Sequence, residues 1–405
     1  MDRASGPAVD SEAELPVMPG RVGRVGLLPM ALLVVLPFAT EAALRLLVQL
    51  YLRDLNASTT IISLSTSLCW LGILFGSAFW GVLSDSKGRR LLLSLILVGS
   101  AAAVAAGAFL PTVEVTLLLV FVRVALLIGI GPITMAIVSA ASSARNRGRS
   151  LSYLSALRTG GFMLGSALAG FVLASAGYRW SFVLFAVLPL VSLSALFRSG
   201  RGDTANGASR HRTFHLLRRG GLRSLYLGTV FRQMGNTGAG SLIFVYMATL
   251  GISPSSSGLL SALNPAMQIA AMLVFGHVAD RIGRQRVFLI GFSLSVVVLA
   301  LFGVSRSAAG IAAGFGLLGV AFPALFIGSA SYIGDLVPRA RQGAMLGLFE
   351  SSRGLGGVLG PLIAGSLTPW IGYRGMFLVM AGLAGIGLVF VLLGRHHRVG
   401  APTAA

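Results

Sequence analysis

The feature that most constrains this chain is a series of twelve apolar segments, each close to the roughly 20 residues that a helix needs to cross a bilayer. Their approximate limits are residues 26–50, 58–82, 91–111, 116–140, 151–174, 180–198, 222–250, 256–278, 287–307, 309–333, 343–369 and 375–394. Hydrocarbon offers no hydrogen-bond partner to a bare backbone, so these segments must be helices. The runs are continuous and lack the alternation of a membrane β-barrel. The sequence therefore predicts an all-α membrane protein with twelve transmembrane helices.

Composition excludes several other classes of protein. Of the 405 residues, 55% are hydrophobic and only 11% are charged, which is too little charge for a soluble domain. The net charge of +20 comes from short loops and not from one basic face, which argues against a nucleic-acid partner. A single cysteine, Cys69, excludes a disulfide framework. Because motifs such as Gly-x-Ser-x-Gly or His-Glu-x-x-His are absent from the sequence, we expect no enzyme activity, catalytic residue, metal or cofactor.

The basic residues predict the orientation of the chain. With the N-terminus in the cytosol, the four arginines left outside are one per loop, namely Arg53, Arg179, Arg306 and Arg374. The opposite orientation violates the positive-inside tendency at nearly every loop. We expect a plasma-membrane protein with both termini in the cytosol. The expected parts are a cytosolic tail (1–24), two six-helix bundles (25–198 and 222–395), a cytosolic central loop (199–221) and a second tail (396–405).

The chain carries an internal repeat at a constant offset of 195 residues. The offset relates several polar and glycine positions in register, namely Asp85 with Asp280, Gly88 with Gly283, Arg89 with Arg284, Arg158 with Arg353, Gly161 with Gly356, Gly165 with Gly360 and Gly177 with Gly372. Such a register predicts a duplicated bundle, with the two copies in parallel.

One polar connector occurs in both copies. It reads Gly81-x-x-x-Asp85-x-x-Gly88-Arg89-Arg90 in the first and Gly276-x-x-x-Asp280-x-x-Gly283-Arg284 in the second. Glycine permits the positive φ of a tight turn. The duplicated connector resembles the loop between the second and third helices of major facilitator superfamily transporters. That resemblance implies two pseudo-symmetric six-helix bundles with a solute site between them.

The same resemblance implies a gate. In that family the aspartate of the connector docks on the eleventh helix and closes the cytosolic side, so Asp85 is expected to dock there and Asp280 on the fifth. Asp335 is expected to complete the second cluster with Arg284 or Arg286. An ordinary basic loop is the alternative interpretation.

Two glycine ladders, one in each copy, predict close helix packing. Their members are Gly161 and Gly165 in the fifth segment, and Gly356, Gly360 and Pro361 in the eleventh. The second ladder resembles the fifth-helix signature associated with exporters of the superfamily, whereas the first has Ser166 in place of the proline. Generic packing of small residues is the alternative explanation.

Charged residues inside the apolar segments are functional candidates because burying them is costly. They are Glu41, Arg45, Arg123, Arg158, Arg232, Glu350 and Arg353. Glu41 and Arg45 are spaced i, i+4, and Glu350 and Arg353 i, i+3, so each pair is either a structural ion pair or part of a site. Because burial and a neighbouring arginine act on carboxylate protonation in opposite directions, Glu41 is our candidate proton carrier.

Further site residues follow from the repeat and the resemblance. Arg123 resembles the fourth-helix arginine of the family, which implies solute contact or tuning of the proton site, against the alternative of a packed arginine. Asn236 is the repeat equivalent of Glu41, and Arg232 lies one turn before it. Arg158 and Arg353 are equivalent to each other, which favours a structural or gating role.

The sequence is consistent with three hypotheses of function. The first is proton-coupled efflux of small drug-like or metabolite molecules by alternating access. The second is a carrier for an anionic metabolite, because five intramembrane arginines face two glutamates. The third is a non-transporting membrane receptor or assembly subunit. The expected partners are a small-molecule solute, protons and the lipid bilayer, with the chain acting as a monomer.

Overall fold

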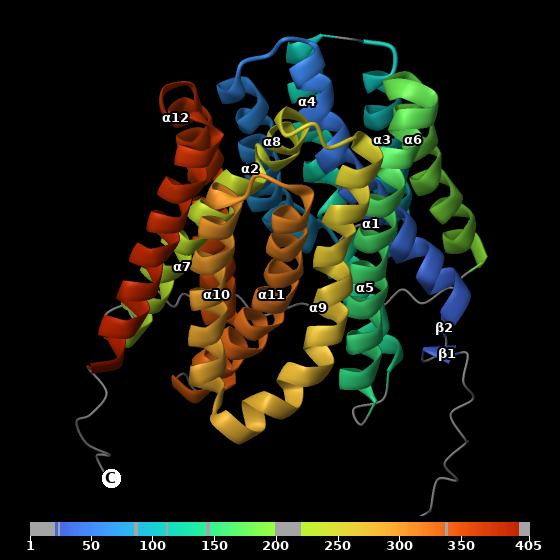
Figure 1. Cartoon of the computed structure of the whole chain (residues 1–405). Coiled ribbons are helices and arrows are strands. Elements are labelled where there is room, and N and C mark those ends of the chain that lie inside the picture. Colours follow the sequence, from blue (N-terminus) through green and yellow to red (C-terminus); the bar gives the residue numbers. More distant parts are fainter. Residues whose placement is uncertain are drawn as a thin grey trace, which may run out of the picture.

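The computed structural model describes residues 21–22, 25–84, 88–110, 112–142, 146–198, 220–336 and 339–396. Apart from the two-residue antiparallel strands β1 (Arg21–Val22) and β2 (Val25–Gly26), these ranges are almost wholly helical. The helices are α1 (Leu27–Asp54), α2 (Thr59–Ser84), α3 (Arg89–Gly107), α4 (Val113–Leu127), α5 (Ile130–Ala141), α6 (Arg147–Arg198), α7 (Gly220–Gly240), α8 (Ile243–Thr249), α9 (Pro254–Ile282), α10 (Arg284–Val304), α11 (Ala308–Leu336) and α12 (Arg339–His396). The nearly all-helical membrane architecture predicted from the apolar segments is confirmed (Figure 1).

The predicted segments correspond to these helices with two kinds of difference. The fourth and seventh segments are each broken, into α4 with α5 and α7 with α8. Conversely, α6 and α12 each run through two segments, with largely apolar spans that are 48 and 47 residues long, about twice what one crossing needs. A single glycine divides each of them, Gly177 (φ 72°) and Gly372 (φ 69°). Only glycine adopts this conformation readily, so each glycine turns the chain between two crossings.

The repeat seen in the sequence is also present in the helix packing. We call α1–α6 the N-half and α7–α12 the C-half. In the N-half α6 packs along α1, and in the C-half α12 packs along α7. Gly165 of α6 faces the carbonyl of Ala39, and its equivalent Gly360 faces the carbonyl of Met234, which is the equivalent of Ala39. Gly161 and Gly356, the first glycine of each ladder, likewise pack against backbone carbonyls at equivalent positions of α1 and α7. The two halves therefore share one packing scheme.

Alanine at position 165 is expected to destabilise the protein. A methyl group there overlaps the Ala39 carbonyl, and over-packing of this kind costs about 1–3 kcal/mol. The control is Gly160→Ala, because a methyl group at Gly160 meets no atom within 4 Å. Alanine at that helical site should be neutral or should stabilise by up to about 1 kcal/mol. Denaturation midpoints of both variants in one detergent measure the difference, and equal midpoints would show that α1 and α6 are not in close contact.

The halves meet through equivalent contacts. Gly170 of α6 lies against Pro254, which opens α9, while its equivalent Gly365 of α12 lies against Thr59, which opens α2. Gln49 of α1 reaches across to the break between α7 and α8, where its amide donates to the Gly240 carbonyl (2.8 Å) and accepts from the Phe244 amide (3.2 Å). Gln49 and Phe244 are themselves equivalent in the repeat. The local symmetry axis therefore passes between them.

The halves separate toward one end of the molecule. We call the end at the α1–α2 and α8–α9 turns the closed end, and the end where α1 begins and α12 finishes the open end (lower end of Figure 1). At the closed end one hydrophobic core joins the halves and includes Leu47, Phe185, Phe244 and Phe377. Nearer the open end further cores each lie within one half, among them one that contains Leu154 and one that contains Phe349.

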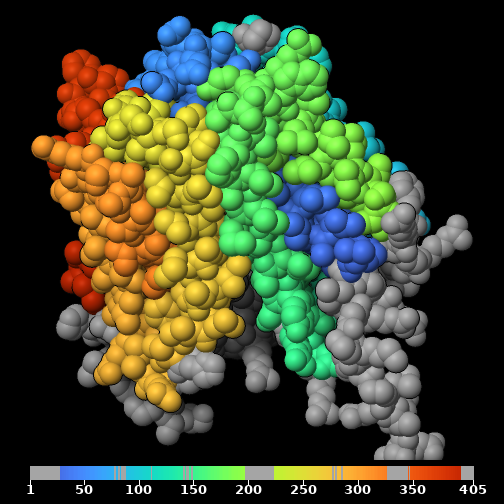
Figure 2. Space-filling view, turned by 45° about the vertical axis from the view of Figure 1, so that its right-hand side comes forward, coloured from blue at the N-terminus to red at the C-terminus, as the bar shows by residue number. Residues whose placement is uncertain are grey.

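The surface agrees with this separation of the cores. Figure 2 shows its lower edge notched between α9, in yellow, and α5 with the start of α6, in teal and green. The hydrogen bonds from Thr59, Ser67 and Ser255 that cross between the halves all lie on the closed side of the notch. The conformation is therefore open at the end where the helices of both chain ends lie.

Candidate functional site

Glu41 is the centre of a buried charge cluster in the N-half. It lies on α1 with only 8% of its surface exposed, and Arg123 of α4 is 4% exposed. Arg123 Nη1 donates to Glu41 Oε2 at 2.6 Å, and Arg45 Nε, one turn along α1, donates to Oε1 at 3.4 Å. The Arg45 side chain is 60% exposed. One carboxylate is thus shared between a buried and an exposed guanidinium, and the cluster carries a net charge of about +1.

Local sequence explains the position of Arg123. It lies one turn before the interruption between α4 and α5, where Gly129 is packed against Trp80 and Ile96. A side chain at 129 would overlap both neighbours, so the glycine allows α4 to approach α2 and α3. The predicted pairing of Glu41 with Arg45 is present, and Arg123 joins it from another helix.

Two phenylalanines that sequence reasoning missed connect this cluster to Arg158. The Arg45 guanidinium lies 5.1 Å from the ring centre of Phe162, and the Phe162 ring lies 5.5 Å from that of Phe38. The Arg158 guanidinium lies 5.8 Å from the centre of the Phe38 ring. Arginines favour such positions over aromatic faces. Helical spacing could have pointed to these phenylalanines, because residues three or four apart share one face of a helix. Phe38 precedes Glu41 by three residues, and Phe162 follows Arg158 by four.

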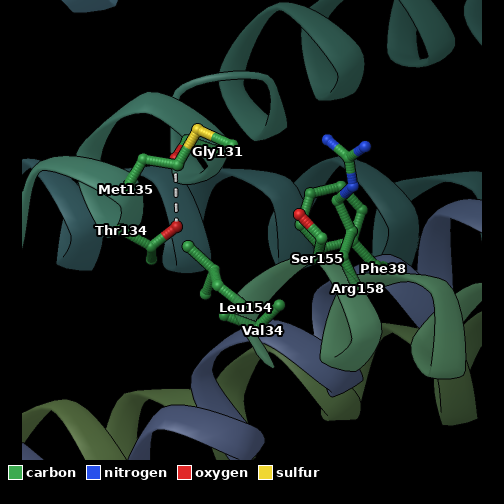
Figure 3. A pocket seen from close by; sticks show the side chains of 8 residues that line it. All are labelled: Val34, Phe38, Gly131, Thr134, Met135, Leu154, Ser155 and Arg158. Atoms are coloured by element: carbon green, nitrogen blue, oxygen red, sulfur yellow. Dashed lines mark hydrogen bonds between the residues drawn. The ribbon is translucent and has the colours of Figure 1, made fainter. Parts of the chain in front are cut away.

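Arg158 also lines a small pocket between α1, α5 and α6. The lining residues are Val34, Phe38, Gly131, Thr134, Met135, Leu154, Ser155 and Arg158. Its volume is about 10 Å³, room for about one water molecule. Figure 3 shows Ser155 and Arg158 on one wall and Thr134 with Met135 across from them. The walls are apolar except for the arginine and two hydroxyl groups.

The repeat equivalents of Ser155 and Arg158, which are Glu350 and Arg353, form a different arrangement in the C-half. Arg353 Nη1 donates to both carboxylate oxygens of Glu350, at 2.9 Å each, as their i, i+3 spacing predicted. The Glu350 side chain is 57% exposed and that of Arg353 is 21% exposed. Arg353 is near enough to repel both Arg158 and Arg232. The two equivalent arginines thus lie on helices of opposite halves, α6 and α12, and act on each other electrostatically.

Arg232 on α7 points into the C-half and away from the Glu41 cluster. It is 6% exposed, its Nε donates to Ser295 Oγ of α10 at 2.9 Å, and its guanidinium lies 5.8 Å from the Phe292 ring centre. No carboxylate pairs with it among the side chains that the structure describes. Asn236, one turn along, is half-buried, and no hydrogen bond of its side chain is found within the described ranges.

The connectors are described only in part. Gly88 and Gly283 precede α3 and α10 with φ of 83° and 88°, and Arg89 and Arg90 form the first turn of α3. The predicted gating role of Asp85 lies outside the described residues. The side chains of Asp280, Arg284 and Asp335, and the packing around Gly81, also lie outside the part that is described. Among the described residues no group of three or more His, Cys, Asp or Glu side chains is arranged to hold a metal ion.

Comparison with known proteins decides the family. A sequence model of the Major Facilitator Superfamily matches the chain twice, over residues 30–224 and 225–405. The chain belongs to the major facilitator superfamily. Members of this superfamily carry small-molecule solutes across membranes, so the chain is a multi-pass membrane protein of a transporter family, which is not a class of enzymes. The resemblance carried by the duplicated connector is confirmed.

Similar proteins agree with this assignment. The multidrug resistance protein MdtG of Dickeya zeae (strain Ech586) is 26% identical over 359 residues, 81% of this chain and 85% of the relative. The uncharacterized MFS-type transporter YuxJ of Bacillus subtilis (strain 168) is 27% identical over 355 residues, 80% of this chain and 88% of the relative.

Solved structures share the fold at low identity. A point mutant of the nucleoside transporter NupG superposes with a TM-score of 0.80 at 14% identity, over 91% of this chain and 99% of that chain. A bacterial homolog to the human lysosomal transporter Spinster, inward-facing and occupied, has a TM-score of 0.79 at 14% identity, over 93% of this chain and 98% of that chain. These likenesses show that the chain has the same fold as these transporters.

Proposed function

We propose that this superfamily member exports small organic molecules in exchange for protons, with Glu41 as the proton carrier. The observation that carries the proposal is the position of Glu41, a buried carboxylate held by Arg123 and by the exposed Arg45. Several relatives are named multidrug resistance proteins, which supports the export of drug-like molecules.

The mechanism follows from the sharing of one carboxylate by two arginines. In the conformation open at one end, Arg45 is 60% exposed and holds Glu41 as its anion together with Arg123. A proton on Glu41 removes the negative charge and weakens both contacts, because a neutral carboxyl forms a weaker hydrogen bond to a guanidinium. Arg45 is then released toward the solute space. Protonation raises the charge of the cluster by one and so disfavours a cationic solute beside it; a cationic solute and the proton would therefore bind alternately, as an exchanger requires.

Alternating access requires two bodies and a defined orientation. The proposed bodies are the N-half and the C-half, with their boundary in residues 199–221, most of which lie outside the described residues. We assign the open end to the cytosol because the predicted inner loops carry most of the arginines. The proposed location is a bacterial plasma membrane, and the proposed working unit is the monomer.

A second candidate function is the transport of an organic anion. Arg45, Arg158 and Arg353 are all at least partly accessible, and Glu350 is already occupied by Arg353. An excess of accessible positive charge favours a carboxylate or phosphate-bearing solute.

Replacing Glu41 by glutamine is the experiment that tests the proposal. In proteoliposomes with an imposed pH gradient, ethidium serves as the cationic probe and fluorescein as the anionic probe. Glu41→Gln should retain downhill flux and lose accumulation on the order of tenfold or more, the range of ordinary coupling free energies. The matched control is Glu114→Gln, an exposed carboxylate in the first turn of α4. Unchanged pH dependence in Glu41→Gln would make Glu41 a structural ion pair and would overturn proton exchange at this site.

A further inference from the structure

The two copies of the repeat differ at one position beside an equivalent arginine. In the C-half, Arg353 binds Glu350, three residues earlier on α12, with both carboxylate oxygens at 2.9 Å. The N-half equivalent of Arg353 is Arg158, and the residue three positions earlier on α6 is Ser155. Where one copy supplies a carboxylate to its arginine, the other copy supplies a hydroxyl group.

Arg158 is therefore left with unused donors. Its one interaction within the described part of the chain, apart from through-space charge effects, is with the Phe38 ring at 5.8 Å. The Ser155 hydroxyl makes no hydrogen bond to any described residue. Thr134, on the facing wall, already donates its hydroxyl to the Ile130 carbonyl at 2.6 Å. The pocket thus presents one guanidinium and one hydroxyl group as unengaged donors on the same wall (Figure 3).

The electrostatic surroundings favour an incoming anion. Arg158 is held in an apolar pocket, and of the charges that act on it the repulsion from Arg353 outweighs the attraction from Glu350. An arginine without a counter-ion is costly in such surroundings. Its planar guanidinium matches a carboxylate through two parallel hydrogen bonds. The Glu350–Arg353 pair shows that a carboxylate suits the equivalent arginine in the same protein.

We propose that Arg158 and Ser155 bind the carboxylate of an organic acid, whose apolar body lies against Phe38 and Met135. The ligand carboxylate takes the place at Arg158 that Glu350 takes at Arg353. The pocket has room for about one water-sized group, so it admits one carboxylate oxygen while the body of the ligand stays on the open side. As a statement of substrate class, the proposal rests on the proposed function, because it takes the space between the halves as the solute path.

Binding of 2-naphthoate to the purified full chain in detergent tests the proposal, with 2-naphthalenemethanol as the uncharged analogue. Fluorescence anisotropy of the naphthalene group gives the affinity of each. In Ser155→Glu the chain supplies its own carboxylate to Arg158, and we expect 2-naphthoate to bind at least about tenfold more weakly. Ser155→Gln has the size of the glutamate variant but no charge and leaves Arg158 without a carboxylate, so it should weaken binding clearly less than Ser155→Glu does. Melting temperatures of both variants establish that they are folded.

Three outcomes would overturn the site. They are equal affinity in Ser155→Glu and Ser155→Gln, equal affinity of the unmodified chain for the acid and the alcohol, and no binding of 2-naphthoate to the unmodified chain. Binding is measured without a proton gradient, so its failure leaves the Glu41 flux experiment unaffected. Conversely, loss of 2-naphthoate binding in Ser155→Glu supports the site at Arg158. It does so even if the transport by Glu41→Gln keeps the pH dependence of the unmodified chain.

Discussion

A leucine in place of Gly365 is expected to abolish most transport while leaving the protein folded. Gly365 lies on α12 where it meets α2 of the other half, with Ser63 packed against it and Thr59 and Thr60 donating to its carbonyl at 3.1 and 3.2 Å. A side chain there has no space while the closed end is closed. Over-packing costs about 1–3 kcal/mol, which lowers the population of this conformation by roughly five- to 150-fold.

We expect Gly365→Leu to lower the flux without lowering the melting temperature, because each half can still fold when the closed end is open. Proteoliposome flux of the probe solutes measures the loss, and the melting temperature in detergent monitors folding. Gly382→Leu is the matched control, since Gly382 is an exposed α12 glycine where an added methyl group meets no atom within 4 Å. Flux near that of the unmodified chain in Gly365→Leu would show that transport does not require the closed end to close.

Removing Arg123 alone is expected to be more damaging than removing both members of its ion pair. Arg123→Leu leaves the 8% exposed Glu41 with only the longer contact to Arg45 at 3.4 Å. Breaking a buried pair by removing one partner costs about 3–5 kcal/mol, whereas replacing both partners by apolar residues is often neutral. The double variant Arg123→Leu with Glu41→Leu should therefore recover most of the lost stability.

The double variant should remain inactive in proton-coupled accumulation, because it has no titratable carboxylate at the cluster. Denaturation midpoints in one detergent separate the single from the double variant, and accumulation of ethidium or fluorescein reports coupling. A double variant that is less stable than Arg123→Leu alone would contradict a buried pair of this kind, since it would show that Glu41 stabilises the fold without Arg123.

The backbone was largely predictable from the sequence, for a physical reason. Membrane helices are imposed by the lack of hydrogen-bond partners in hydrocarbon, so apolar length alone located them. The breaks before α5 and α8 were not predicted, because small residues such as Gly129, Gly240 and Ser241 are common inside membrane helices and do not by themselves mark a break. Their cause is tertiary, as the fit of Gly129 against Trp80 shows.

The site was predictable only where its members are close in sequence. Helical spacing paired Glu41 with Arg45, since residues four apart share one face. Arg123 is 82 positions from Glu41, and its partner depends on the rotation of α4 about its axis. Lipid is as apolar as the protein core, so an apolar stripe does not reveal that rotation. Because the rotation of the helices is not readable from the sequence, the contact between the rings of Phe38 and Phe162 was not predicted either.

The side chain of Gln49 has a consequence for how the halves move. The gap between α7 and α8 frees one carbonyl and one amide group, and this single glutamine satisfies both from the opposite half. Pulling the halves straight apart at that point would strand three polar groups in a dry region. Gln49 therefore helps to hold the closed end shut, and opening of that end requires water or another polar group to replace its two hydrogen bonds.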